Sequence, residues 1–180
     1  MTKKKNLKKK GLIIVNTGDG KGKTTAALGI MLRASGQKMR SCMIQFIKDK
    51  KGRFGEHIAA EQLNLEIVTT GDGFTWKSRD IDHSAELARH GWEIAKQKIQ
   101  SGNYDIVVLD EFTYPLNFGW IPFDEFKEWI THFKPASMHL VITGRNAREE
   151  LIELADLVTE MTALKHSYNE DIPAQRGIEF

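Results

Sequence analysis

A run of glycine, lysine and threonine residues near the N-terminus has the composition of a loop that binds a nucleoside triphosphate. The run reads Thr17-Gly18-Asp19-Gly20-Lys21-Gly22-Lys23-Thr24-Thr25. Its glycines let the backbone bend so that successive N–H groups point toward one anion. A helix beginning near Lys23 would add the positive end of its dipole. We predict that Gly18–Thr25 binds the triphosphate, that Lys23 contacts its oxygens during catalysis, and that Thr24 ligates Mg²⁺.

The spacing of this run departs from the strict Walker A pattern by one residue. The pattern G-x-x-x-x-G-K-[ST] requires a glycine at position 17, where this chain has Thr17, and Gly18 follows one step late. A glycine-rich turn that happens to precede a Lys-Thr pair is the alternative. An apolar strand before the loop and a helix after it form the context that the motif requires, so we favour the phosphate-binding loop.

Acidic residues that suit Mg²⁺ follow a second apolar stretch. The stretch Ile106-Val107-Val108-Leu109 ends in Asp110 and Glu111, as a Walker B strand does. Carboxylates are hard oxygen ligands, so we predict that Thr24, Asp110 and Glu111 surround the metal. Apolar strands ending in aspartate are common, and the prediction therefore depends on the phosphate-binding loop upstream. Arg145 follows another apolar stretch and offers its guanidinium to the triphosphate, although a surface arginine in a turn is the alternative.

Large aromatic residues follow a glycine-rich turn, where polar residues would be expected. The segment is Gly71-Asp72-Gly73-Phe74-Thr75-Trp76. Phe74 and Trp76 could fold back into the core, which is the usual fate of such side chains, or they could line a pocket for a large planar ligand. Trp92 and Trp129 fall on predicted helices, where we expect them to belong to the core.

Composition favours one globular domain with a basic tail. The chain has 180 residues, of which 41% are hydrophobic. Six lysines fall within residues 1–10, and the rest of the chain holds 20 basic and 24 acidic residues. We predict a disordered tail over residues 1–10, although its lysines could touch phosphates or anionic lipid. Residues 11–180 are predicted to form a single domain, whose acidic balance argues against nucleic acid as a partner.

Cys42 is the only cysteine, which excludes an internal disulfide and a cysteine-based metal cluster. Its place in an apolar stretch predicts a small buried residue. No apolar run approaches the roughly 18 residues that a membrane span needs. The N-terminal lysines resemble the start of a signal peptide, but the apolar run behind them is too short. We therefore expect a cytoplasmic protein without a membrane partner.

Apolar and amphipathic stretches alternate along the chain. Apolar stretches predict strands at Leu12–Val15, Met39–Ile47, Leu65–Thr69, Ile106–Leu109, Leu140–Thr143 and Leu157–Met161. Amphipathic stretches predict helices at Lys23–Ser35, Asp82–Gln100, Phe123–Phe133 and Ala147–Leu154. This alternation is typical of an α/β fold with a mostly parallel sheet flanked by helices, in which ligands bind at the carboxyl ends of the strands.

Taken together, these motifs resemble the P-loop class of ATP:cob(I)alamin (corrinoid) adenosyltransferases, also called cob(I)yrinic acid a,c-diamide adenosyltransferases. The shared segments are, in chain order, Thr17–Ala27, Gln45–Lys48, Gly73–Trp76, Val108–Tyr114, Ile142–Arg145, Lys165-His166 and Ala174–Phe180. The likeness runs from Gly11 to Phe180, and Thr17 is itself typical of the family. The resemblance implies a P-loop NTPase fold of the RecA-like type. It also implies transfer of the 5′-deoxyadenosyl group of ATP to the Co(I) centre of a corrinoid, with release of triphosphate.

The resemblance further implies roles for individual residues and partners. Phe74 and Trp76 match aromatics below the corrin that exclude axial ligands of cobalt, so that Co(II) becomes easier to reduce. Arg33 on the first helix matches a nucleotide contact. Lys23, Arg145 and Mg²⁺ would stabilise the leaving triphosphate. The family is typically homodimeric, and the lysine-rich tail could attract an acidic electron donor such as a reduced flavodoxin. A generic P-loop ATPase or kinase is the alternative function.

Overall fold

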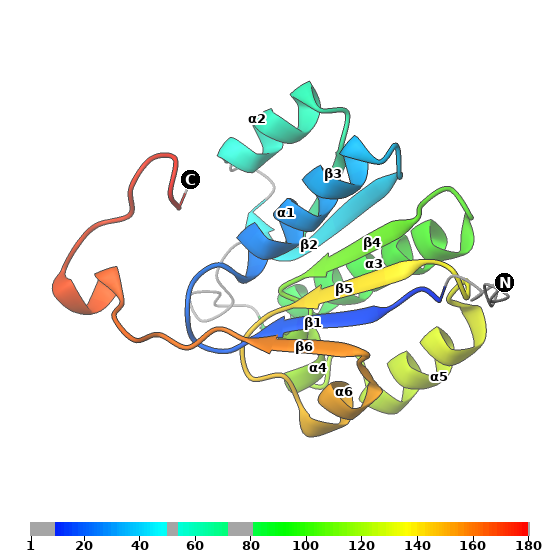
Figure 1. Ribbon diagram of the computed structural model, residues 1–180. Coiled ribbons are helices and arrows are strands. Elements are labelled where there is room, and N and C mark those ends of the chain that lie inside the picture. The colour runs from blue at the N-terminus through cyan, green and yellow to red at the C-terminus, as the bar shows by residue number, and fades with distance from the viewer. Residues whose placement is uncertain (1–9, 50–53, 72–80, 180) are drawn as a thin grey trace, which may run out of the picture.

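The computed structural model describes residues 10–49, 54–71 and 81–179, and it is built around one parallel sheet (Figure 1). The described strands follow the order β3-β2-β4-β5-β1-β6, and every pairing between neighbours is parallel. Their bounds are β1 Ile13–Thr17, β2 Ser41–Asp49, β3 Glu66–Gly71, β4 Ile106–Asp110, β5 His139–Thr143 and β6 Leu157–Glu160. The predicted α/β fold with a parallel sheet is thereby confirmed.

Helices cover both faces of the sheet, as Figure 1 shows for α1 in front of the strands and α3 behind them. The helices are α1 Lys23–Gly36, α2 Gly55–Gln62, α3 Ile81–Gln100, α4 Thr113–Asn117, α5 Phe123–Phe133 and α6 Glu149–Leu154, followed by a 3₁₀ turn at Ser167–Glu170. Side chains of β4 alternate between the two faces. Val107 and Leu109 pack with residues of α3 and α5, whereas Ile106 and Val108 pack against α1. Burial on both faces explains the unbroken apolar character of this strand.

The larger core is centred on aromatic rings. Trp92 on α3 is 2% exposed, and its ring centroid lies 5.5 Å from those of Phe112 and Phe126. Trp129 is half-buried and meets Trp92 edge-on at 5.2 Å. Cys42 is fully buried in β2. The expectations that Trp92 and Cys42 lie in the core are confirmed, and Trp129 packs at its margin.

Two helices were not expected from the sequence. Helix α2 buries only Ala60 among its eight residues, so it lacks the apolar periodicity that reveals an amphipathic helix. Helix α4 has five residues, including Pro115, and is too short to show a period. The predicted tail lies almost wholly outside the described residues, so this prediction stays untested. Among the helices that the structure describes, none combines the length and apolar character needed to cross a membrane.

Candidate active site

A cavity of about 900 Å³ lies where the predicted glycine loop leaves β1. The predicted site residues that line it are Asp19, Gly20, Lys21, Gly22, Lys23, Thr24, Thr25, Glu111 and Arg145. These residues follow β1, β4 and β5, so the cavity lies at the carboxyl ends of adjacent parallel strands, where α/β folds bind ligands.

The glycine loop begins one residue later than the strict motif because β1 extends through Thr17. Thr17 is paired in the sheet with Glu160, and its Oγ1 accepts a hydrogen bond from the N–H of Ala147 at 3.0 Å. The first left-handed residue is Gly18, with φ 94°, and Gly22 precedes α1 with φ 110°. Both conformations favour glycine. Position 17 has no such requirement, which accounts for the departure from the Walker A spacing.

Lys23 is held inside the loop, at the start of α1. Its Nζ donates to the carbonyl oxygens of Gly18 and Gly20, at 2.7 Å each, and the residue is only 7% exposed. Burial lowers the pKa of Lys23, while the negative charge of Glu111 opposes this effect. The ammonium group of Lys23 is therefore already at the cavity wall before a ligand binds. When a triphosphate binds, this group can exchange its two carbonyl partners for phosphate oxygens.

Gly20 is packed closely against the chain segment that follows β6. Its N–H donates to the carbonyl oxygen of Met161 at 2.6 Å, and a Cβ atom at position 20 would lie 2.7 Å from the same oxygen. Glycine is thus required here by a backbone neighbour as well as by any phosphate. The N–H of Met161 in turn donates to the carbonyl of Thr17 at 2.8 Å, so this segment and the loop shape each other.

We expect Gly20→Ala to lower the free energy of unfolding by about 1–3 kcal/mol, because the added methyl group must displace backbone. Gly29→Ala is the matched control, since Gly29 lies in α1 with nothing within 4 Å of its would-be Cβ. That substitution should stabilise the protein by about 0.5–1 kcal/mol. Thermal unfolding of both variants measures the difference. Equal stability of the two variants would contradict the packing described for Gly20.

Asp110 is fully buried and accepts hydrogen bonds on both carboxylate oxygens. Its Oδ1 accepts from the hydroxyls of Thr24 at 2.8 Å and Thr143 at 2.7 Å. Its Oδ2 accepts from Nε2 of Gln45 at 3.2 Å. Because the Thr24 hydroxyl donates its hydrogen bond to Asp110, the lone pairs of the Thr24 oxygen are left for a cation. Asp110 therefore orients Thr24.

Glu111 differs from Asp110 in having an unsatisfied carboxylate. Its backbone is left-handed, with φ 60°, and its N–H donates to Oγ1 of Thr143 at 2.9 Å. Its Oε2 is buried and has no hydrogen-bond partner within the part of the chain that the structure describes. Burial raises the pKa of Glu111 to about 7; nearby Asp110 adds to this effect, and Lys23 and other cations oppose it. A buried carboxylate oxygen without a partner is suited to a metal ion.

Thr24 and Glu111 supply only two oxygen ligands. Such a site suits Mg²⁺ better than it suits a metal whose ligands all come from protein side chains. Within residues 10–49, 54–71 and 81–179 no group of three or more His, Cys, Asp or Glu side chains is placed to hold a metal ion. Mg²⁺ commonly binds one or two protein carboxylates and completes its shell with water and substrate phosphates. The neighbouring glycine loop is where those phosphates are expected.

Not every predicted site residue reaches the cavity. Arg145 is exposed and lines it, whereas Arg33 is exposed on α1 and is not among the lining residues. Phe74 and Trp76 lie outside the described residues. The roles of these four residues, like those of the other predicted site residues, remain predictions. Lys48, near the end of β2, also lines the cavity. Its place directly after the apolar stretch Met39–Ile47 is a signal that could have revealed it.

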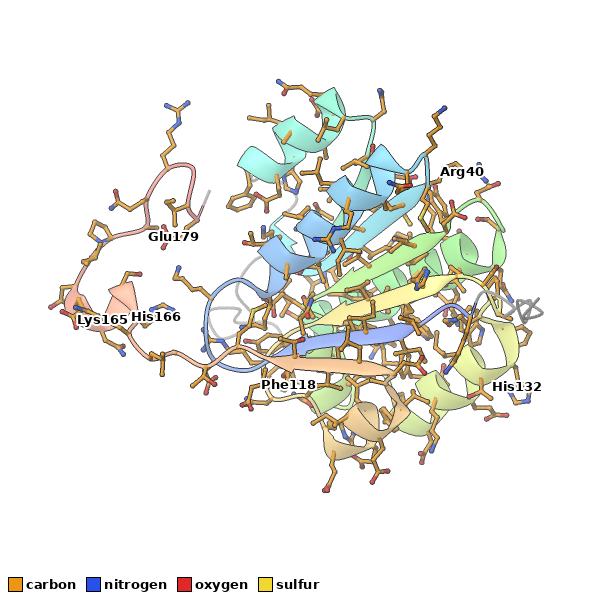
Figure 2. All side chains as sticks on the ribbon, viewed as in Figure 1. Arg40, Phe118, His132, Lys165, His166 and Glu179 are labelled. Atoms are coloured by element: carbon orange, nitrogen blue, oxygen red, sulfur yellow. The ribbon has the colours of Figure 1, made fainter. Side chains whose placement is uncertain are left out.

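The C-terminal segment forms another wall of the cavity that the sequence did not predict. Gly177, Ile178 and Glu179 line the cavity, and Oε1 of Glu179 lies 2.7 Å from Nζ of Lys21. Figure 2 shows Glu179 on this segment, which extends away from the sheet before its end turns back. The contact joins residues far apart in the chain, so no local pattern could have indicated it.

The chain is similar to known proteins over nearly its whole length. A model of the family described as ATP:corrinoid adenosyltransferase BtuR/CobO/CobP matches residues 9–180. A corrinoid adenosyltransferase from Sinorhizobium sp is 40% identical over 173 residues, covering 95% of this chain and 81% of that protein. Corrinoid adenosyltransferases from Pseudomonas aeruginosa and Escherichia coli (strain K12) are 36% and 35% identical, over 95% of this chain and 84% and 86% of theirs. Because the match includes the glycine loop, β4 and the C-terminal segment together, the chain belongs to the family of ATP:corrinoid adenosyltransferases.

Proposed function

We propose that the protein transfers the 5′-deoxyadenosyl group of ATP to the Co(I) centre of a corrinoid, either cobalamin or a precursor, and releases inorganic triphosphate. The electron pair of Co(I) forms the Co–C bond at C5′ of the ribose, and the C5′–O bond breaks with its electrons going to the triphosphate. Co(I) has no proton to lose, so the reaction needs no general base. The surrounding residues instead bind and orient the two substrates and stabilise the leaving triphosphate. Membership of the family supports this proposal.

The observation that carries the proposal is the cavity at the glycine loop, with Lys23 held in place at its wall. Its volume of about 900 Å³ lies within the range of small-molecule sites. Its charged lining residues are four basic ones, Lys21, Lys23, Lys48 and Arg145, and four acidic ones, Asp19, Glu56, Glu111 and Glu179. Glu179 and Glu56 form ion pairs with Lys21 and Lys48, which leaves Lys23 and Arg145 as the cations for the triphosphate. Negative charge develops on the triphosphate as the C5′–O bond breaks, and positive groups that are already in place stabilise that charge most effectively. Lys23 meets this condition because two loop carbonyls hold it in position.

Mg²⁺ is the cofactor that we propose for this site. Thr24 and Glu111 would hold it, with Asp110 orienting Thr24 through the hydrogen bond at 2.8 Å. When bound, the ion would supply further positive charge to the departing triphosphate. The buried, unpartnered Oε2 of Glu111 supports this assignment.

The proposed partners rest on the family resemblance. Phe74 and Trp76 are proposed to lie against the lower face of the corrin, where neither side chain can ligate cobalt. Arg33 is proposed to contact the nucleotide, which would then extend along α1 beyond the cavity. We further propose a homodimer, a cytoplasmic location and an electron-donor protein such as a reduced flavodoxin.

ATP hydrolysis or phosphoryl transfer is the alternative function, and one observation favours it. Glu111 directly follows the Walker B aspartate, and burial raises its pKa to about 7. A carboxylate with such a pKa can accept a proton from water or a hydroxyl group near neutral pH. In that case the attack occurs at the γ-phosphorus, and the products are ADP with phosphate or a phosphorylated acceptor.

Product analysis distinguishes the two reactions. The protein is incubated with ATP, Mg²⁺ and a corrinoid that a chemical reductant holds as Co(I). The Co–C bond is followed by visible absorbance, and the phosphorus products are separated by ion-exchange chromatography. We expect one triphosphate for each Co–C bond formed and no ADP. ADP without a Co–C bond would overturn the proposed transfer in favour of the hydrolase or kinase.

A further inference from the structure

We infer that Gln45 and His57 position Asp110 and the start of α2 around the bound nucleotide through one directed chain of hydrogen bonds. This inference rests on the proposed function. Gln45 lies in β2 and is fully buried, and His57 is the third residue of α2. Neither residue lines the cavity, so both are positioning residues rather than catalytic ones.

The direction of each hydrogen bond follows from its neighbours. The N–H of Phe54 donates to Nδ1 of His57 at 3.2 Å, so Nδ1 carries no proton and Nε2 does. Nε2 of His57 lies 2.8 Å from Oε1 of Gln45 and therefore donates to it. Nε2 of Gln45 then donates to Oδ2 of Asp110 at 3.2 Å. Reversing the Gln45 amide would place its oxygen against the Asp110 carboxylate, so only one orientation satisfies both neighbours.

These hydrogen bonds fix the Asp110 carboxylate through Oδ2, the oxygen that Thr24 does not contact. With Thr24 and Thr143 on Oδ1 and Gln45 on Oδ2, the plane of the Asp110 carboxylate is set by donors on both oxygens. Asp110 in turn aims the Thr24 oxygen into the cavity. Buried polar networks whose members are all satisfied are rigid, and their bonds polarise one another in the same direction. A leucine at position 45 would fill similar volume, but it would remove the donor to Oδ2 of Asp110 and the acceptor at 2.8 Å from Nε2 of His57.

The same hydrogen bonds also reach the part of the cavity lining that α2 supplies. His57 holds the first turn of α2, because its ring accepts the N–H of Phe54, the residue before the helix. Gly55 and Glu56 in that turn line the cavity, and Glu56 forms an ion pair with Lys48. Gln45 therefore connects the proposed Mg²⁺ side of the cavity with its α2 wall. We expect loss of this connection to weaken binding of the metal–nucleotide complex specifically.

Mn²⁺ in place of Mg²⁺ gives a readout that does not depend on turnover. Electron paramagnetic resonance measures how the protein takes up Mn²⁺–ATP, and kinetics separates KM for ATP from KM for the corrinoid. Gln45→Leu should weaken Mn²⁺–ATP binding by about 3- to 10-fold, because Gln45 acts on Thr24 through Asp110. Loss of a group that contacts a metal ligand directly costs roughly 10- to 100-fold. KM for ATP should rise in parallel, and KM for the corrinoid should not change. Gln100→Leu, at an exposed position on α3, is the control.

A matched pair at position 57 tests the direction of the chain. In His57→Gln the side chain keeps one acceptor for the Phe54 N–H and one donor for Gln45, and glutamine is a favoured residue at this helix position. We expect Mn²⁺–ATP binding close to that of the wild type. His57→Glu has a similar shape but no donor, and it should weaken binding by about 3-fold or more, although its added charge attracts cations. Thermal unfolding confirms that each variant is folded.

The outcomes separate the inference from the proposed function on which it rests. Wild-type affinity in folded Gln45→Leu, or equal affinity in His57→Gln and His57→Glu, would overturn the positioning role. If Gln45→Leu does not fold, the pair at position 57 decides. A wild-type protein that binds no Mn²⁺–ATP at all would overturn the proposed nucleotide site instead.

Discussion

Replacing Lys23 by alanine is expected to lower kcat/KM for ATP by on the order of 10²–10³-fold, the usual effect of losing a fixed group that stabilises a leaving charge. The lysine is only 7% exposed, so a cation from the solvent cannot readily occupy the position of its ammonium group. Its removal also leaves the carbonyls of Gly18 and Gly20 without their donor. Both consequences act on the triphosphate, so binding of inorganic triphosphate, measured by calorimetry, should weaken as well.

Lys127→Ala provides the control for this prediction, because Lys127 is an exposed lysine on α5 away from the cavity. It should leave both the kinetics and triphosphate binding unchanged. If Lys23→Ala kept its affinity for triphosphate and its kcat/KM, the loop would not be the triphosphate site, and the catalytic role assigned to this lysine would be wrong.

Replacing Glu111 by glutamine is expected to weaken the proposed metal site and to stabilise the metal-free protein. Binding of Mn²⁺–ATP should fall by more than about 10-fold, because glutamine retains the shape of the side chain but not its charge. In the metal-free protein the ionised carboxylate is unfavourable, since burial raises its pKa from 4.5 to about 7. A shift of this size corresponds to at most about 3 kcal/mol. Glu111→Gln should be more stable than the wild type by up to that amount at pH 8.

The pH dependence of this effect has a definite sign. Between pH 4.5 and about 7 the folded protein holds a proton on Glu111 that the unfolded chain has released, so the wild type loses stability as pH rises through this window. Below it both states are protonated, and the difference between Glu111→Gln and the wild type should vanish. Denaturant unfolding without metal, at pH 4 and pH 8, measures both values. Glu86→Gln, at an exposed position on α3, is the control. A difference that does not depend on pH would contradict the burial argument.

Much of the fold could be predicted because its elements carry local periodicity. The apolar residues of β4 and β5 are buried on both faces, and the amphipathic pattern of α5 matches its buried residues Phe123, Phe126 and Ile130. Such patterns depend only on neighbours in the sequence. The strand ends then indicated where side chains that bear chemistry would meet. Glu111 and Arg145, which follow β4 and β5, do line the same cavity, and their roles there stay predictions.

The features that could not be predicted are contacts between distant parts of the chain. Helix α2 has little apolar periodicity, so nothing indicated that His57 would meet Gln45. The close approach of Met161 to Gly20 and the ion pair between Lys21 and Glu179 likewise depend on tertiary packing. The sequence suggested that Gly20 serves the phosphate, and only the structure shows that it must also accommodate a neighbouring backbone.

The position of β1 in the sheet has a consequence for how the protein is made. Both neighbours of β1 are strands from the last third of the chain, since Ile13–Thr17 pairs with β5 and β6. During synthesis the glycine loop therefore leaves the ribosome long before β5 and β6, the strands that pair with β1. The nascent chain must carry an apolar strand without partners until β5 has emerged, and such distant pairings form slowly. The glycine loop thus reaches its final structure late in synthesis. Until then the apolar strand β1 is exposed, and we expect chaperones to bind the nascent chain mainly in this interval.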